Sequence, residues 1–356
     1  MRLPAEYVGL PREEALERTA IARQKLGRDV VILGHHYQSD DIIRFADFRG
    51  DSLELSRIAA GQKEARCIVF CGVSFMAETA AMLCAPHQVV LMPAMEAPCP
   101  MAMMASVADA EVAWRHAAGA WGEENIIPIT YQNSSAELKA FCGRHGGAVC
   151  TSANARAVFR WAIDQGKRIL FFPDEWLGKN TALALGYTLE QVAVWDPGAP
   201  FGGDPDLDRA QIMVWKGYCH VHTHFTVAHV EEARRRYPGC IVIVHPECPV
   251  PVVQAADLNG STSYIIKQVE AAPAGSTFVV GTECNLVYRL DREQPDKTVV
   301  PLAKSFCGTM ARTTIAHLLY TLESLLEGRL VGRITVDPET TRWANIALER
   351  MLSIKG

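Results

Sequence analysis

The sequence predicts an α/β protein made of three similar three-layer α/β/α domains with parallel sheets, in a pseudo-threefold arrangement around a central active site. Short runs rich in β-branched residues alternate with helical patterns along all 356 residues, which favours parallel sheets covered by helices. One succession of segments then occurs three times, as expected for a repeated structural unit. We predict domains at residues 1–110, 111–224 and 225–335, with the tail 336–356 packing on the first.

Each repeat contains the same series of elements. A strand with a polar tip comes first, expected within residues 30–37, 125–133 and 240–247. A helix led by a hydroxyl residue follows, expected within residues 50–60, 150–162 and 259–272. Another strand is expected within residues 67–83, 168–182 and 278–290. Each repeat ends in a loop with a cysteine, and these cysteines are Cys99, Cys219 and Cys307.

The polar tips of the first strands correspond to one another. They are His35-x-Tyr37, Tyr131-x-Asn133 and His245-x-Glu247. In open parallel α/β sheets, ligands bind outside the carboxyl ends of the strands, which is where these tips lie. A threefold arrangement would therefore direct all three tips toward one binding site.

Hydroxyl residues open the helices that follow the tips. They are Ser52 in the first repeat, Ser152 in the second, and Ser261 with Thr262 in the third. Free N–H groups and the positive end of the helix dipole favour phosphate or carboxylate at such positions. Simple N-capping is the alternative for each residue taken alone. The recurrence in all three repeats favours anion binding.

Eleven cysteines without a C-x-x-C pair leave two interpretations. Most of them, such as Cys67, Cys71 and Cys240, lie in or beside strand-like runs and are expected to be core residues. One cysteine per repeat at corresponding places, however, could supply three ligands to a central metal. Three thiolates leave one iron of a four-iron cluster open, and that iron can act as a Lewis acid.

The segment CHVHTH, residues 219–224, allows a second kind of metal site. If the segment is a strand, His220, His222 and His224 share one face and Cys219 points the other way. Three histidines on one face could bind zinc, as in a zinc-dependent aldolase or hydrolase. The segment alone does not choose between this site and a thiolate site.

Composition points to small-molecule partners. Thirty-five basic residues against forty acidic ones give a net charge of −5, so no basic field attracts nucleic acid or an anionic membrane. The N-terminal residues lack the apolar core of a signal peptide, and no apolar run approaches the length of a membrane span. We therefore expect a cytoplasmic protein.

These residues also resemble a known family, the quinolinate synthases, which are iron-sulfur enzymes of NAD biosynthesis. The resemblance runs from Val30 to the C-terminal tail and is carried by GHHYQSDDI, GDSLELSR, VSFMAETA, YQNSSAELKAFC, TSANA, KGYCHVHTHFT, VHPECP and GSTSYII. It implies three α/β/α domains and one [4Fe-4S] cluster held by Cys99, Cys219 and Cys307. It also implies condensation of iminoaspartate, supplied by aspartate oxidase, with dihydroxyacetone phosphate to give quinolinate, phosphate and water.

The resemblance also implies roles for single residues. Glu247 would be the base, Tyr37 a proton donor or acceptor, and His222 the active-site histidine near the open iron. The implied substrate-binding residues are His35 and His245 for carboxylates or hydroxyls, Tyr131 and Asn133 for iminoaspartate, Ser52 and Ser152 for phosphate, and Ser261 and Thr262 for a carboxylate or the phosphate. One departure, Cys284-Asn285 where a small residue is expected, leaves the role of Cys284 open. A non-catalytic iron-sulfur sensor is the remaining alternative.

Overall fold

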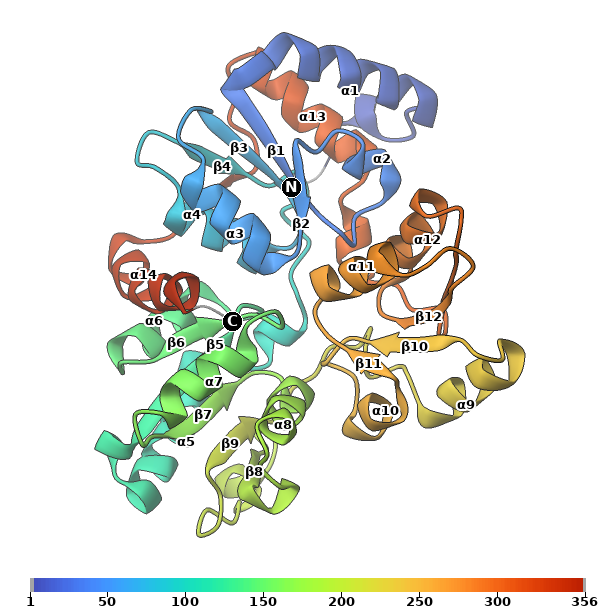
Figure 1. Ribbon diagram of the computed structural model, residues 1–356. Coiled ribbons are helices and arrows are strands. Elements are labelled where there is room, and N and C mark those ends of the chain that lie inside the picture. The colour runs from blue at the N-terminus through green and yellow to red at the C-terminus, as the bar shows by residue number, and fades with distance from the viewer. Residues whose placement is uncertain (1–2, 355–356) are drawn as a thin grey trace. The chain divides into compact units, whose positions relative to one another are not determined.

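Three β-sheets form the framework of the fold (Figure 1). The structure, a computed structural model, describes residues 3–354. The strand orders are β14-β4-β3-β1-β2, β6-β5-β7-β9-β8 and β11-β10-β12-β13. In every sheet the first strand of a repeat lies between the second and the third and is parallel to both. The predicted α/β class is confirmed, whereas the pseudo-threefold arrangement stays a prediction.

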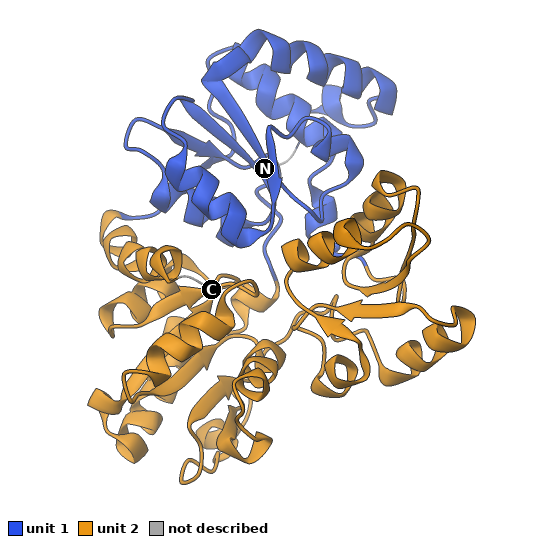
Figure 2. Cartoon of the chain, viewed as in Figure 1, with its two compact units in different colours: residues 1–99, 306–337 blue, residues 100–305, 338–356 orange. Residues whose placement is uncertain are grey.

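The described residues fall into two compact units (Figure 2). Unit 1 comprises Met1–Cys99 and Phe306–Asp337, and unit 2 comprises Pro100–Ser305 and Pro338–Gly356. The first sheet lies in unit 1, and the second and third sheets lie in unit 2. The domain limits 1–110, 111–224 and 225–335 stay predictions. Two segments, described below, pack elsewhere than predicted.

Unit 1 is built on the first sheet. Its strands are β1 (Val30–His35), β2 (Phe48–Gly50), β3 (Cys67–Cys71), β4 (Val89–Leu91) and β14 (Arg333–Ile334). Its α-helices are α1 (Arg12–Leu26), α2 (Asp40–Ile43), α3 (Ser52–Gly61), α4 (Ser74–Leu83) and α13 (Ile315–Leu326). Every residue of β1 and β3 is buried, as expected for parallel strands with helices on both faces.

The segment 306–337 belongs to unit 1 and not, as predicted, to the third repeat. Its helix α13 buries Leu318, Leu322 and Leu325 in one apolar cluster with residues of β1, β3 and β4. Its short strand β14 pairs antiparallel with β4. The apolar face of α13 therefore completes the core of the first sheet.

The N-terminal helix α1 packs along α13. Arg18 of α1 pairs with Glu323 of α13 at 2.8 Å, and the hydroxyl of Tyr7 donates to the same carboxylate at 2.6 Å. Residues 5–26 are therefore part of the packed body of unit 1.

Unit 2 contains two fully parallel sheets. The second sheet has β5 (Ile126–Tyr131), β6 (Ala148–Cys150), β7 (Arg168–Phe172), β8 (Val192–Trp195) and β9 (Ile212–Trp215). Its helices are α5 (Val107–Trp121), α6 (Ala136–Arg144), α7 (Ala155–Ile163) and α8 (Glu175–Ala184). The third sheet has β10 (Ile241–Val244), β11 (Leu258–Asn259), β12 (Thr277–Gly281) and β13 (Thr298–Pro301). The remaining helices that follow in the chain are α9 (Val227–Arg236), α10 (Val250–Ala255), α11 (Thr262–Ala271) and α12 (Cys284–Glu293).

The C-terminal helix α14 (Pro338–Ser353) packs against α6 and β6, so the predicted docking of the tail on the first repeat is wrong. Gly143 of α6 lets the two helices approach closely, since a Cβ there would lie 1.9 Å from the carbonyl oxygen of Trp343. Asn154 also donates to the carbonyl of Met351 at 3.1 Å. The tail joins the second repeat because the complementary surface for its apolar face lies there.

None of the helices within residues 3–354 is long and apolar enough to span a membrane.

Candidate active site

The predicted polar tips lie at the carboxyl ends of the first strands. His35 is the last residue of β1, Tyr131 is the last residue of β5, and His245 directly follows β10. The side chains of His35, Tyr131 and His245 are all at most 5% exposed. Each sheet therefore carries buried polar groups at the edge where parallel sheets bind ligands. Of the tip residues, His35 and Tyr37 belong to unit 1 and the others to unit 2.

The tips of the first and third repeats have the same local geometry. The Nδ1 atom of His35 accepts a hydrogen bond from the backbone N–H of Tyr37 at 3.1 Å. The Nδ1 atom of His245 likewise accepts from the N–H of Glu247 at 3.3 Å. An accepting Nδ1 carries no proton, so neutral His245 is protonated on Nε2, which donates to the hydroxyl of Ser152 at 3.1 Å.

The segment after Cys219 is a helical turn and not a strand. The backbone N–H groups of His222 and Thr223 both donate to the carbonyl of Cys219, at 3.1 and 3.0 Å. His222 is 1% exposed, whereas His220 and His224 are exposed. The alternative zinc face of His220, His222 and His224 needed an extended strand, and it does not form because a turn sends alternate residues in different directions.

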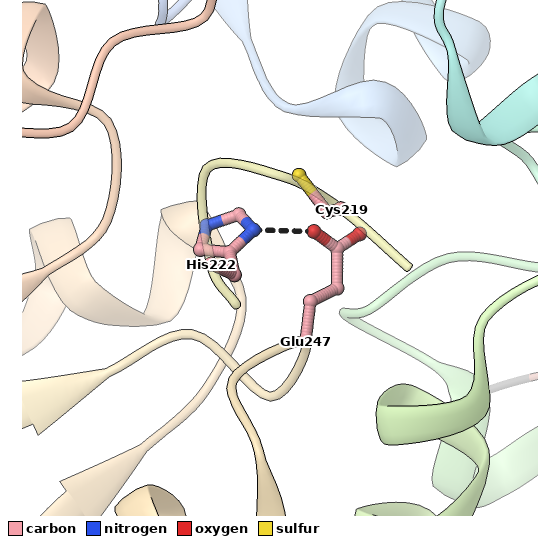
Figure 3. A group of neighbouring side chains, drawn as sticks. All are labelled: Cys219, His222 and Glu247. Atoms are coloured by element: carbon pink, nitrogen blue, oxygen red, sulfur yellow. Dashed lines mark ion pairs between the residues drawn. The ribbon is translucent and has the colours of Figure 1, made fainter. Parts of the chain in front are cut away.

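The same turn brings Cys219 and His222 next to Glu247 (Figure 3). One ligand atom from each of the three residues lies within 4.8 Å of the other two. His222 Nδ1 lies 2.5 Å from Glu247 Oε2, and His222 Nε2 lies 3.0 Å from the hydroxyl oxygen of Thr282. The turn and the β10–α10 loop thus assemble a thiol, an imidazole and a carboxylate, a combination suited to proton transfer or to metal binding.

Electrostatics keep the carboxylate of Glu247 charged. Burial favours its neutral form, but the charges of His222 and His245 and hydrogen bonds from His222 and Tyr131 lower the pKa of Glu247 to about 2. His245 stacks on His222 with ring centroids 4.3 Å apart. Burial and the charge of His222 lower the pKa of His245 to about 3, so its ring is neutral at neutral pH.

The sequence did not predict two residues near Glu247. They are Asp174, which caps helix α8, and Asn180, which lies within that helix. Asp174 is fully buried and caps α8 by accepting from the N–H of Leu177 at 2.6 Å. Burial and the charge of Glu247 raise the pKa of Asp174 well above its ordinary value. Asn180 donates to the backbone carbonyls of Pro246 and Cys248. The signal available for Asp174 was an acidic residue at a helix start, which by itself indicates only a cap.

The predicted anion-binding hydroxyls occupy different positions at their helices. Ser261 caps α11 and accepts from the N–H of Tyr264, and Thr262 is the first residue of that helix. Ser52 is the first residue of α3, where Asp51 is the cap. Ser152 lies in a turn before α7, which begins at Ala155. The prediction that all four open a helix is therefore wrong for Ser152, because its hydroxyl contacts His245 instead.

The exposure of the cysteines separates the predicted cluster ligands from most of the others. None of the eleven forms a disulfide, and seven are buried. Those of intermediate exposure are Cys84, Cys99, Cys219 and Cys307. Cys84 caps the C-terminal end of α4, and its thiol donates to the carbonyl of Ala81. The three predicted ligands are thus among the four cysteines that are not fully buried, and their role as cluster ligands stays a prediction.

Parallel sheets with buried acid–base groups at their carboxyl ends define an α/β enzyme. The family model described as Quinolinate synthetase A protein matches residues 19–353. The chain is 48% identical to the quinolinate synthase of Corynebacterium glutamicum, over 99% of this chain and 90% of that protein. It is 49% identical to the quinolinate synthase of Anoxybacillus flavithermus, over 99% and 96% of the two chains. The chain belongs to the quinolinate synthase family.

Proposed function

We propose that the chain condenses iminoaspartate with dihydroxyacetone phosphate to give quinolinate, inorganic phosphate and water in NAD biosynthesis. The identity of 48% and 49%, over 99% of this chain, with two relatives named quinolinate synthase supports this reaction. The observation that carries the proposal is the buried carboxylate of Glu247, held 2.5 Å from His222 at the carboxyl end of a parallel sheet. The reaction needs carbon-bound or nitrogen-bound protons to be removed, and Glu247 is the base in position for this step.

His222 and Glu247 are proposed to act as one proton-transfer unit. The low pKa of Glu247 means that the carboxylate is deprotonated at neutral pH, which is the form that a base needs. His222, in contact with it, can take part in returning that proton to a departing hydroxyl. A unit that first accepts a proton as a base and then donates it as an acid suits a reaction that includes two dehydrations. Tyr131, which hydrogen bonds to Glu247, would orient the iminoaspartate portion together with Asn133.

The other residues are proposed to bind the substrates. Asn133 has a buried Oδ1 that accepts no hydrogen bond from the described residues, so it can accept one from an amine or imine. Carboxylate, hydroxyl and phosphate groups would be held by His35, His245, Ser52, Ser152, Ser261 and Thr262. Tyr37, which lies against the ring of His35 with centroids 4.7 Å apart, is the proposed proton donor or acceptor in the first unit.

Cys99, Cys219 and Cys307 are the proposed ligands of a [4Fe-4S] cluster. When bound, a cluster with three cysteine ligands supplies a Lewis-acidic iron that can polarise a substrate oxygen. The intermediate exposure of the three thiols supports this assignment. We further propose a cytoplasmic location and a transient contact with aspartate oxidase.

An anaerobic assay tests the proposed function. The holoprotein is incubated with dihydroxyacetone phosphate and with iminoaspartate generated in place, and quinolinate is identified by mass. We expect product only when both substrates are present. Absence of product from protein with a full cluster would favour the iron-sulfur sensor, and stoichiometric zinc without sulfide would contradict the cluster.

A further inference from the structure

Glu247 lies in a short, largely buried loop with few backbone N–H donors. The loop joins β10 to α10 and contains two prolines, Pro246 and Pro249, which have no N–H to donate. Within the loop, the N–H of Cys248 donates to the carbonyl of His245 at 3.0 Å. The residues on either side of Glu247 are Pro246 and Cys248, which are both buried and each have a backbone carbonyl.

A single side chain from another layer binds both of these carbonyls. Asn180 Nδ2 lies 2.8 Å from the carbonyl oxygen of Pro246 and 2.8 Å from that of Cys248. The amide group has two N–H bonds, so each carbonyl receives one of them. Asn180 is 7% exposed and belongs to α8, whose residues also pack against α10. Helix α8, which follows strand β7 of the second sheet, thereby holds the loop between β10 of the third sheet and α10.

This contact restrains the backbone on both sides of Glu247. A rotation of the Pro246–Glu247 or the Cys248–Pro249 peptide would remove a buried carbonyl from its donor, and the N–H groups of Glu247 and Cys248 already donate to His245. The Glu247 carboxylate must meanwhile stay within 2.5 Å of His222 Nδ1. A misplacement of a reacting group by about 1 Å can cost about a hundredfold in rate.

We propose that Asn180 is the positioning residue that holds Glu247 in its reactive place, through the two backbone carbonyls that flank it. The proposal rests on the proposed role of Glu247 as the base. Asn180 acts through the loop and uses both amide N–H bonds there.

Two substitutions test the proposal by kinetics. Asn180→Asp keeps the shape but replaces the donor with an acceptor that repels both carbonyls, and Asn180→Ala removes the donor without adding charge. We expect kcat to fall at least tenfold in both variants, since a transition-state interaction is lost. The KM for each substrate should stay within about threefold of the wild-type value. Iron and sulfide content should stay at the wild-type level.

The pH profile separates positioning from a general structural role. The added carboxylate of Asn180→Asp raises the pKa of Glu247, so the acidic limb of kcat/KM should move to higher pH in that variant. A purely structural role would lower the active fraction equally at every pH. The matched control is Asn125→Asp, because Asn125 Nδ2 also donates to a backbone carbonyl at 2.8 Å, but at the amino end of β5. This control should keep the wild-type kcat and profile.

A crystal structure of Asn180→Ala provides a readout without turnover. We expect the loop to shift and the 2.5 Å contact between His222 and Glu247 to open. An unchanged contact with unchanged kcat would overturn the proposal, and so would a loss of kcat matched by an equal loss of folded, cluster-containing protein. If the wild type makes no quinolinate, the proposed function fails, and the crystal structure alone still decides whether Asn180 positions the loop.

Discussion

His222 Nδ1 lies 2.5 Å from Glu247 Oε2, and neither side chain is more than 3% exposed. The two residues come from different loops, the turn after Cys219 and the loop after β10. Their contact forms only when both loops fold against each other. A buried carboxylate in contact with an imidazole is well suited to acid–base catalysis, and substitution of Glu247 should affect the chemistry more than the folding.

Glu247→Gln should abolish most of the turnover and keep the cluster. Loss of a general base typically costs about 10²- to 10⁴-fold in rate, so kcat for quinolinate formation should fall within that range. Iron and sulfide analysis should give wild-type values. The control is Glu190→Gln, an exposed carboxylate in the same unit, which should keep full activity. A Glu247→Gln enzyme with normal kcat would remove Glu247 from the mechanism.

Three cysteines should be required for the cluster and a fourth should not. Cys99→Ser, Cys219→Ser and Cys307→Ser should each lose most of the bound iron, sulfide and brown colour after anaerobic purification. Cys84→Ser is the matched control, because Cys84 is the remaining cysteine of intermediate exposure. Its cluster content should equal that of the wild type. Retention of four irons and four sulfides in Cys219→Ser would contradict the assignment.

His245 should make the protein less stable as the pH falls below about 6.5. Its folded-state pKa is lowered to about 3, so between these values the unfolded chain binds a proton that the folded chain does not. The free energy of unfolding therefore rises with pH across this window, by up to about 1.4 kcal/mol per pH unit for one group. Below pH 3 both states are protonated and the slope from His245 ends.

The pH effect of His245 can be isolated by substitution. Its neighbours are His222, Glu247 and Ser152, so chemical denaturation at pH 5 and pH 7 should compare His245→Gln with the wild type. The difference between the two pH values should shrink in His245→Gln and stay unchanged in the exposed control His224→Gln. Equal pH slopes for His245→Gln and the wild type would contradict the prediction.

Asp174 should have the opposite effect on stability. Because its folded-state pKa is raised by burial and by Glu247, its contribution is fully present below the unfolded pKa and is lost as the pH rises through the folded pKa. Asp174→Asn removes this titration and keeps a side-chain oxygen that can cap α8. The stability of Asp174→Asn relative to the wild type should therefore increase from pH 5 to pH 8. Thermal unfolding checks this, with the exposed Asp208→Asn as a control that shows no trend.

Much of the framework follows from local sequence patterns. The apolar runs at 30–35 and 126–131 predict strands, and each becomes a buried parallel strand that ends at its predicted polar tip. Such predictions succeed because strand formation and the polarity of a strand end depend on neighbouring residues. The same holds for the third repeat, where His245 directly follows the apolar strand β10 and Glu247 lies two residues further along the chain.

Predictions that depended on distant contacts were less successful. The sequence by itself determined the α/β class, the order of the strands along the chain, the polar tips and the family resemblance. Only the tertiary structure decided that α13 joins the first sheet, that α14 docks on α6, and that His222 alone of the histidine triplet turns inward. It also placed Asn180 on the Glu247 loop. The reason is physical: an amphipathic helix or a short turn shows which face is apolar, while the surface that covers this face comes from residues far away in the chain.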